Sequence, residues 1–319
     1  MHLTPVAPGT KIKHLAKPIV GMRPLTPADE LRRLVEGDSI VVAPGVFSPS
    51  VAMLAERARF KALYFSGAGF SSLMGLPDLG MTTLSEVARA AGEITSQVSL
   101  PLVVDADTGF GEALNVARTV SEMKRVGAAG IHIEDQVLPK RCGHLDGKEL
   151  VDADEMVKKL IAAKEESRGG LFIIARTDSR TVEGLDSAIE RSRAYSRAGA
   201  DMLFPEALES KAEFAEFRKK VKGPLMANMT EFGKTPYLTA DEFESLGYNM
   251  VIFPVTAFRA MMQAVKKAYA ELVSKGTQKG MLESLMTRKE FYALIDYEKY
   301  EKADATALGK ARKLRTGGR

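Results

Sequence analysis

Residues 101–135, PLVVDADTGFGEALNVARTVSEMKRVGAAGIHIED, contain the pattern that decides the fold of this 319-residue chain. Two apolar runs, at 101–104 and 130–133, enclose an amphipathic segment at 113–126 that is followed by Gly127. Runs that are apolar at nearly every position are typical of strands buried on both faces of a sheet, and glycine is favoured directly after a helix. The stretch therefore predicts two buried strands joined by a helix.

The same pattern recurs on both sides of this stretch. Further apolar runs lie at 39–43, 62–65, 171–175, 200–204, 224–227 and 250–253, and further amphipathic segments lie at 84–97, 153–165, 185–198 and 211–220. Eight strand–helix units in about 250 residues have the length and rhythm of a (β/α)8 TIM barrel, which is an α/β fold. A doubly wound open sheet is the alternative, but the Gly67-Ala68-Gly69 segment does not extend into a GxGxxG dinucleotide fingerprint.

The sequence divides into three parts. Residues 1–25 form an N-terminal arm that lacks acidic residues, as a transit peptide does, but its prolines would break the amphipathic helix of such a peptide. Residues 26–305 form a single catalytic barrel domain. It begins with a helix that has Thr26 as its N-cap and Pro27 at its first position. Residues 306–319 form a basic tail that we expect to be flexible.

The end of the barrel domain predicts an oligomer. An eighth helix is expected at 257–273, and appended helices at 280–305 carry apolar residues spaced to bury one face. Helices in excess of a closed barrel often pack on a neighbouring subunit, so we expect this region to contact a second copy of the chain.

Composition argues against several classes of function. The formal charge of +4 arises from basic residues spread along the chain, which gives little support to nucleic-acid binding. No apolar run approaches the roughly 18 residues that span a bilayer, so we expect no membrane partner. The single cysteine rules out an internal disulfide framework and indicates a reducing compartment. We therefore predict a cytoplasmic protein.

Carboxylates gather at the predicted carboxyl ends of two strands, on the face where barrels hold their active sites. Asp105 and Asp107 follow the third strand, and Glu134 follows the fourth. Crowded carboxylates repel one another unless they are protonated or bind a cation. Because oxygen ligands without a histidine pairing favour Mg²⁺ or Mn²⁺, the three residues predict a metal site; a salt-bridged acidic patch is the alternative.

Arg176 follows the fifth strand and can bind a carboxylate or phosphate through two parallel hydrogen bonds. We therefore expect a small anionic substrate. His132 lies within the fourth strand, where its side chain is as consistent with the core as with catalysis.

The segment Lys140-Arg141-Cys142-Gly143-His144 follows the fourth strand and contains the only cysteine. Cationic neighbours should make its thiol easier to ionise, and the neighbouring charges suit a core badly. We predict a reactive cysteine on a loop at the active face; a buried structural cysteine is the alternative.

The motifs at these positions resemble the isocitrate lyase / phosphoenolpyruvate mutase superfamily, from about residue 34 to residue 300. The KRCGH segment is specific to the lyase branch, and the chain lacks the large insertions of isocitrate lyases proper. The resemblance rests on SGAG at 66–69, LPD at 76–78, VDADTGFG at 104–111, IEDQ at 133–136, KRCGH at 140–144, ARTD at 175–178, FPE at 204–206 and NMTEFG at 228–233.

The resemblance implies a (β/α)8 barrel that binds Mg²⁺, with Mn²⁺ as the alternative, through Asp105, Asp107 and Glu134. It further implies a homotetramer in which the eighth helix is exchanged between subunits. The cysteine loop would move over the site when substrate binds and exclude water.

The implied reaction cleaves 2-methylisocitrate to pyruvate and succinate, a step of propionate breakdown through the methylcitrate cycle. The implied catalytic residues are Cys142, as the proton donor to the succinate-like carbanion, with Arg176, Lys140, His144 and the candidate base Tyr64. The substrate-binding residues that the resemblance implies are Ser66, Gly67, Ala68, Cys142, Gly143, Arg176, Glu206, Asn228, Met229, Thr230, Arg259 and Arg288.

One departure from the family pattern affects substrate choice. Members commonly have three glycines after the serine, and this chain has Ala68 at the second of them. A related lyase acting on dimethylmalate, oxaloacetate or isocitrate is therefore the alternative. Phosphonate chemistry is disfavoured by Cys142, and a non-enzymatic binding barrel is disfavoured by the complete set of metal, cysteine and arginine positions.

Overall fold

The computed structural model describes residues 25–315, so all but the last residue of the arm predicted at 1–25 lies outside the described residues. Within that range, eight parallel strands form one sheet in the order β6-β5-β4-β3-β2-β1-β8-β7. A parallel bridge between Leu203 and Leu225 joins the two edges, which confirms the predicted (β/α)8 barrel. The strands are β1 Val41–Val46, β2 Leu63–Phe65, β3 Leu102–Asp105, β4 Gly130–Glu134, β5 Phe172–Thr177, β6 Met202–Pro205, β7 Met226–Asn228 and β8 Met250–Phe253.

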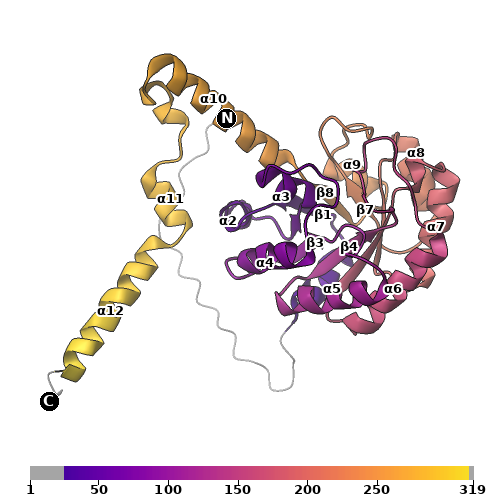
Figure 1. Cartoon of the computed structure of the whole chain (residues 1–319), viewed down its shortest axis with the longest axis horizontal. Helices are drawn as coiled ribbons and strands as arrows, with labels where there is room; N and C mark the ends of the chain where they lie inside the picture. The colour runs from indigo at the N-terminus through magenta and orange to yellow at the C-terminus, as the bar shows by residue number, and fades with distance from the viewer. Residues whose placement is uncertain (1–24, 316–319) are drawn as a thin grey trace.

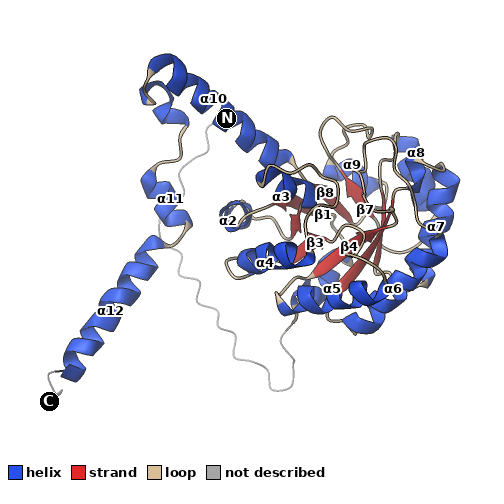
Figure 2. Ribbon diagram, in the orientation of Figure 1, coloured by secondary structure: helices blue, strands red, loops and turns tan. Residues whose placement is uncertain are grey.

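Helices surround the strands (Figures 1 and 2). Those predicted between 84 and 273 from their amphipathic pattern are confirmed to within a few residues. The helices are α1 Pro27–Val35, α2 Pro49–Arg57, α3 Gly67–Leu73, α4 Leu84–Thr95, α5 Ala113–Arg125, α6 Ala153–Ser167, η1 Ser179–Thr181, α7 Leu185–Arg197, α8 Lys211–Lys220, α9 Ala240–Ser245, α10 Thr256–Lys275, η2 Lys279–Ser284, α11 Arg288–Leu294 and α12 Tyr297–Arg315.

Helix α1 closes the amino-terminal end of the barrel. Its start is fixed by a capping box, in which the Asp29 N–H donates to Thr26 Oγ1 at 3.1 Å and the Thr26 N–H donates to Asp29 Oδ2 at 3.0 Å. Leu31 and Val35 are fully buried in the same apolar cluster as the inward-facing side chains of the strands, including Phe172. The second, larger core lies between the strands and the outer helices.

Gly45 allows β1 to approach the end of β8 closely. A Cβ at this position would lie 1.9 Å from the carbonyl oxygen of Pro254, and neither backbone can move without breaking barrel hydrogen bonds. We expect Gly45→Ala to lower the free energy of unfolding by about 1–3 kcal/mol, measured by denaturant unfolding followed by circular dichroism. The matched control is Gly309→Ala, because an added Cβ meets nothing within 4 Å on exposed α12. Equal stability of the two variants would contradict the steric argument.

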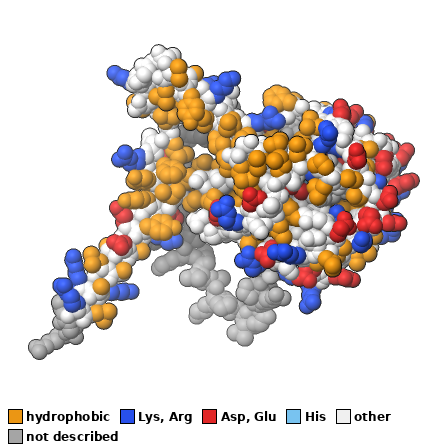
Figure 3. Space-filling view, in the orientation of Figure 1, with side chains coloured by type: hydrophobic (Ala, Val, Ile, Leu, Met, Phe, Trp, Pro, Cys, Tyr) orange, Lys and Arg blue, Asp and Glu red, His pale blue; other side chains and the backbone are white. Residues whose placement is uncertain are grey.

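The appended helices leave the barrel as an arm, in which α10 and α12 run outward and the C-terminal end lies far from the sheet (Figure 1). Neither α10 nor α12 has a buried residue. Figure 3 shows hydrophobic side chains along this arm, and those exposed include Tyr269, Val273 and Tyr300. The described helices include none that is long and apolar enough to cross a membrane.

The prediction of a flexible tail from residue 306 is wrong for residues 306–315, which continue α12. Alanine, lysine, arginine and leucine dominate this stretch, and all four are strong helix formers. Residues 316–319 lie outside the described part of the chain.

Candidate active site

A cavity of about 320 Å³ opens at the carboxyl ends of the strands. It brings together most of the predicted site residues, although they are up to 195 positions apart in the sequence. The predicted residues that line it are Tyr64, Ser66, Ala68, Asp105, Lys140, Cys142, Gly143, His144, Arg176, Glu206, Asn228, Thr230 and Arg259.

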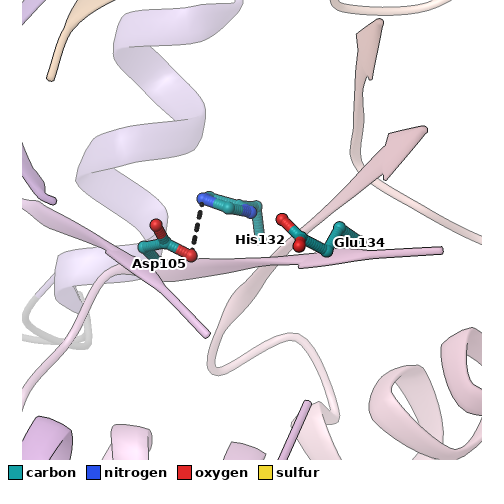
Figure 4. Close-up of side chains that lie close together, drawn as sticks. All are labelled: Asp105, His132 and Glu134. Atoms are coloured by element: carbon teal, nitrogen blue, oxygen red, sulfur yellow. Dashed lines mark ion pairs between the residues drawn. The ribbon is translucent and has the colours of Figure 1, made fainter. Parts of the chain in front are cut away.

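Asp105, His132 and Glu134 form a buried cluster beside the cavity (Figure 4). One potential ligand atom from each lies within 4.8 Å of the others, and Nε2 of His132 is 3.2 Å from Oδ1 of Asp105. Among the described residues, Oε1 of Glu134 has no hydrogen-bond or ion-pair partner. An unpartnered buried carboxylate oxygen is costly, so the two carboxylates of this cluster fit a divalent cation that prefers oxygen ligands. Nε2 of His132 is already in contact with Asp105 and Tyr64.

His132, for which the sequence left core and catalytic positions open, lies in this cluster. Burial lowers its pKa to about 4, although the Asp105 carboxylate opposes the shift, so the imidazole is neutral at pH 7. The hydroxyl of Tyr64 lies 2.7 Å from Nε2 of His132 and 3.4 Å from Oδ2 of Asp105. Burial and then Asp105 raise the pKa of Tyr64 well above its usual value, which makes this residue a poor base at neutral pH.

Asp107 lies apart from the cluster that contains Asp105. Its backbone φ of 47° is left-handed, so the chain turns after β3 and the strict alternation of a strand no longer applies. Its Oδ1 lies 2.8 Å from Nζ of Lys140, and the same ammonium also binds Asp78. Burial, together with Asp105, raises the pKa of Asp107 to about 6 even though Lys140 opposes the shift.

Arg176 is surrounded by carboxylates at the end of β5. Its Nη1 lies 3.0 Å from Glu134, its Nε and Nη2 donate to Asp178 at 3.0 and 3.1 Å, and its Nε lies 3.5 Å from Glu206. Burial alone would lower the pKa of Arg176, but Asp178, Glu134 and Glu206 together raise it well above its usual value. The guanidinium is therefore a permanent cation at the base of the cavity, oriented by several acceptors.

Residues 137–149 form a flap over this cavity. The flap leaves the barrel at an antiparallel bridge between Gln136 and Leu150, and the Gln136 side chain bonds to both backbone groups of Arg141. At the tip, Nε2 of His144 lies 3.0 Å from Glu206. Nδ1 of His144 accepts from the backbone of Lys234 at 3.0 Å, so in the neutral ring Nε2 carries the proton.

The thiol of Cys142 is held in its protonated form. Burial raises its pKa above the usual value, and the carboxylates of Asp78 and Glu206 add to the shift, whereas a backbone hydrogen bond from His144 opposes it. The sequence prediction that neighbouring cations make this thiol easier to ionise is therefore wrong. The ammonium of Lys140 is directed at Asp78 and Asp107 rather than at the sulfur.

Three predicted binding residues do not line the cavity. The Gly67 N–H donates to Oδ2 of Asp105 at 3.2 Å, and Met229 is buried below the surface of the site. Arg288 is the first residue of α11 on the arm, and it does not line the cavity of its own chain.

Sequence reasoning also missed residues that the structure places in or under the site. Asp78 binds Lys140, and Lys148 binds Asp178. Asp78 belongs to the LPD motif at 76–78, but the sequence does not predict its contact with Lys140, because the two residues are 62 positions apart. Phe204, Val255 and Phe258 line the cavity as apolar residues and gave no signal of their own.

The fold and the site define a (β/α)8-barrel enzyme with an acidic cluster, an arginine and a cysteine flap at one cavity. Residues 31–273 match the family model for phosphoenolpyruvate phosphomutase. The chain is 57% identical over 284 residues to the 2-methylisocitrate lyase of Aeropyrum pernix, and the matched region covers 89% of this chain and 92% of the relative. The chain therefore belongs to the phosphoenolpyruvate mutase / isocitrate lyase superfamily and groups there with the 2-methylisocitrate lyases.

Solved structures agree with this assignment. A crystal structure of 2,3-dimethylmalate lyase, a member of the same superfamily, superposes with a TM-score of 0.84 at 39% identity and covers 89% of this chain and 96% of its own. Phosphonopyruvate hydrolase in complex with oxalate and Mg²⁺ superposes with a TM-score of 0.81 at 30% identity, covering 89% of this chain and 100% of its own.

Proposed function

We propose that the chain is a carbon–carbon lyase that cleaves 2-methylisocitrate to pyruvate and succinate, as part of propionate breakdown. The observation that carries the proposal is a protonated cysteine thiol, Cys142, on a flap above a cavity that also holds Arg176 and an acidic cluster. A phosphonomutase has no use for such an acid, whereas a lyase must protonate the carbanion that bond cleavage leaves.

The proposed cofactor is Mg²⁺, with Mn²⁺ as the alternative. Asp105 and Glu134 supply oxygen ligands, and neutral His132 holds Asp105 in place. Asp107, whose backbone N–H donates to Oδ1 of Asp105 at 3.1 Å, would contribute through water. When bound, the ion makes the substrate hydroxyl easier to deprotonate and offsets negative charge on the oxoacid.

The other groups bind and orient the substrate. Arg176 offers a carboxylate a fixed cation, and Ser66 with Ala68 faces the oxoacid half, while the Gly67 N–H orients Asp105. The pocket for the remaining carboxylates is shaped by Glu206, Asn228, Thr230 and Arg259, with the flap residues Lys140, Gly143 and His144, and Met229 packs beneath it.

Cleavage breaks one carbon–carbon bond. The hydroxyl proton leaves to a base, the oxoacid keeps the new carbonyl, and the electron pair stays on the carbon beside the succinate carboxylate. Cys142 donates its proton to that carbon. The raised pKa of Tyr64 argues against the phenol as the base, so we assign it the role of a hydrogen-bond donor to the cluster.

The proposed assembly is a cytoplasmic homotetramer in which α10 and the helices after it are exchanged between subunits. The uncovered apolar residues of the arm support this, because a long helix without a buried residue needs a partner. In that assembly Arg288 belongs to a neighbouring subunit's cavity.

Pyruvate release by the purified enzyme with Mg²⁺ tests the function. We expect the highest kcat/KM with 2-methylisocitrate in a panel that includes isocitrate, dimethylmalate, oxaloacetate and phosphonopyruvate. Glyoxylate detection reports isocitrate cleavage. A clear preference for another member would overturn the substrate assignment and direct attention to Ala68, which lines the cavity where relatives commonly have glycine.

A further inference from the structure

The tip of the flap lies directly on the floor of the cavity. A Cβ on Gly143 would lie 2.4 Å from Cγ of Glu206 and 2.5 Å from Nη2 of Arg176. Only glycine, which has no side chain, allows the flap backbone to approach Glu206 and Arg176 this closely. In the closed position the flap tip is therefore packed directly against the arginine.

Lys148, on the returning limb of the flap, joins these two parts. Its ammonium donates to the carbonyl oxygen of Gly143 and to Oδ1 of Asp178, the latter at 2.9 Å. The side chain is 1% exposed, so both hydrogen bonds form away from water and are charge-assisted. The same Asp178 carboxylate accepts two hydrogen bonds from the Arg176 guanidinium.

Asp178 is itself held in place by a hydrogen bond to a buried carboxylate, Asp135. Its backbone N–H donates to Oδ1 of Asp135 at 2.9 Å, and the hydroxyls of Thr177 and Tyr195 donate to the other oxygen of Asp135, each at 2.7 Å. Asp135 is fully buried in this network. Asp178 is thus a rigid anchor, and whatever binds it takes up a defined position.

We propose that Lys148 is a positioning residue that latches the flap closed by joining Gly143 to the carboxylate that orients Arg176. The proposal rests on the proposed lyase function for its catalytic consequence. Cys142 then reaches the reacting carbon only when the flap tip is bound to the same anchor as the arginine. Release of the latch leaves the thiol intact but removes it from the site.

The lone cysteine makes the latch measurable without turnover. The rate at which iodoacetamide alkylates Cys142 reports how often the flap opens, because the thiol is partly buried when it is closed. The matched control is Lys159→Met. Lys159 is also a buried lysine that donates to a backbone carbonyl, that of Thr108, but it lies on α6 outside the cavity.

We expect Lys148→Met to raise the alkylation rate about tenfold, the population change that follows loss of the charge-assisted hydrogen bond to Gly143, which is the one that holds the flap tip. Removal of a nearby cation would by itself make the thiol harder to ionise and slow the reaction, so acceleration reports opening. We also expect kcat to fall about 10- to 100-fold, with a smaller change in KM, because a misplaced acid affects the chemical step more than binding.

Lys159→Met should leave both the alkylation rate and kcat near the wild-type values. If Lys148→Met does not fold, Lys148→Gln keeps a donor without the charge and should give an intermediate rate. Wild-type labelling in Lys148→Met or Lys148→Gln, or equally fast labelling in Lys159→Met, would overturn the latch. Because alkylation needs no substrate, absence of lyase activity would contradict the proposed function and leave this result intact.

Discussion

Cys142→Ser should lower kcat for 2-methylisocitrate by about 10²- to 10⁴-fold, the range that a general acid contributes. Serine preserves the size of the side chain, but its hydroxyl gives up a proton far less readily than a thiol. The thiol itself is poised for this role, because burial keeps it protonated at neutral pH. Steady-state pyruvate release measures the loss.

The fold and metal affinity should be unchanged in Cys142→Ser, as circular dichroism and Mn²⁺ titration would show. Glu149→Gln is the matched control, since Glu149 lies on the same flap with an exposed side chain. Retained turnover in Cys142→Ser would remove the proton-donor role.

Asp105→Ala should abolish activity and weaken Mn²⁺ binding by at least about 100-fold, since changes even to groups that only support a metal ligand cost 10- to 100-fold. The substitution also leaves His132 and Tyr64 without the carboxylate that both approach. Electron paramagnetic resonance of free Mn²⁺ during titration gives the affinity without any need for turnover.

Asp186→Ala provides the comparison for that titration, because Asp186 is an exposed carboxylate that pairs with Lys220 on the barrel surface. It should bind Mn²⁺ like the wild type. Unchanged affinity in Asp105→Ala would place the metal elsewhere, whatever the effect on activity.

The barrel could be predicted because its signal is local. Buried parallel strands such as Gly130–Glu134 are apolar at most positions, and the intervening helices carry their own periodicity. The placement of polar groups at the carboxyl ends of strands follows from the fold, so Asp105, Glu134 and Arg176 could be predicted to lie together at one end of the barrel before any contact was known.

The electrostatics of the site could not be predicted in the same way, because they depend on contacts between distant residues. Lys140 is adjacent to the cysteine segment in the sequence, yet its charge is directed to Asp78 and Asp107, and burial then dominates the pKa of Cys142. The left-handed turn at Asp107 likewise ends the alternation of the strand, and its carboxylate binds Lys140 instead of joining the cluster that contains Asp105.

Helix α1 has a consequence for the order of events at the cavity. Leu31 and Val35 are buried in one apolar cluster with the inward-facing strand residues, so within residues 25–315 packed side chains close the barrel floor beneath the cavity. On the proposed chemistry both fragments leave through the mouth by which the substrate entered, beneath the flap. The two products then leave in order, and the fragment nearer the mouth dissociates first. The inner fragment leaves last and can rebind to the free enzyme, so it is the product that inhibits competitively against the substrate.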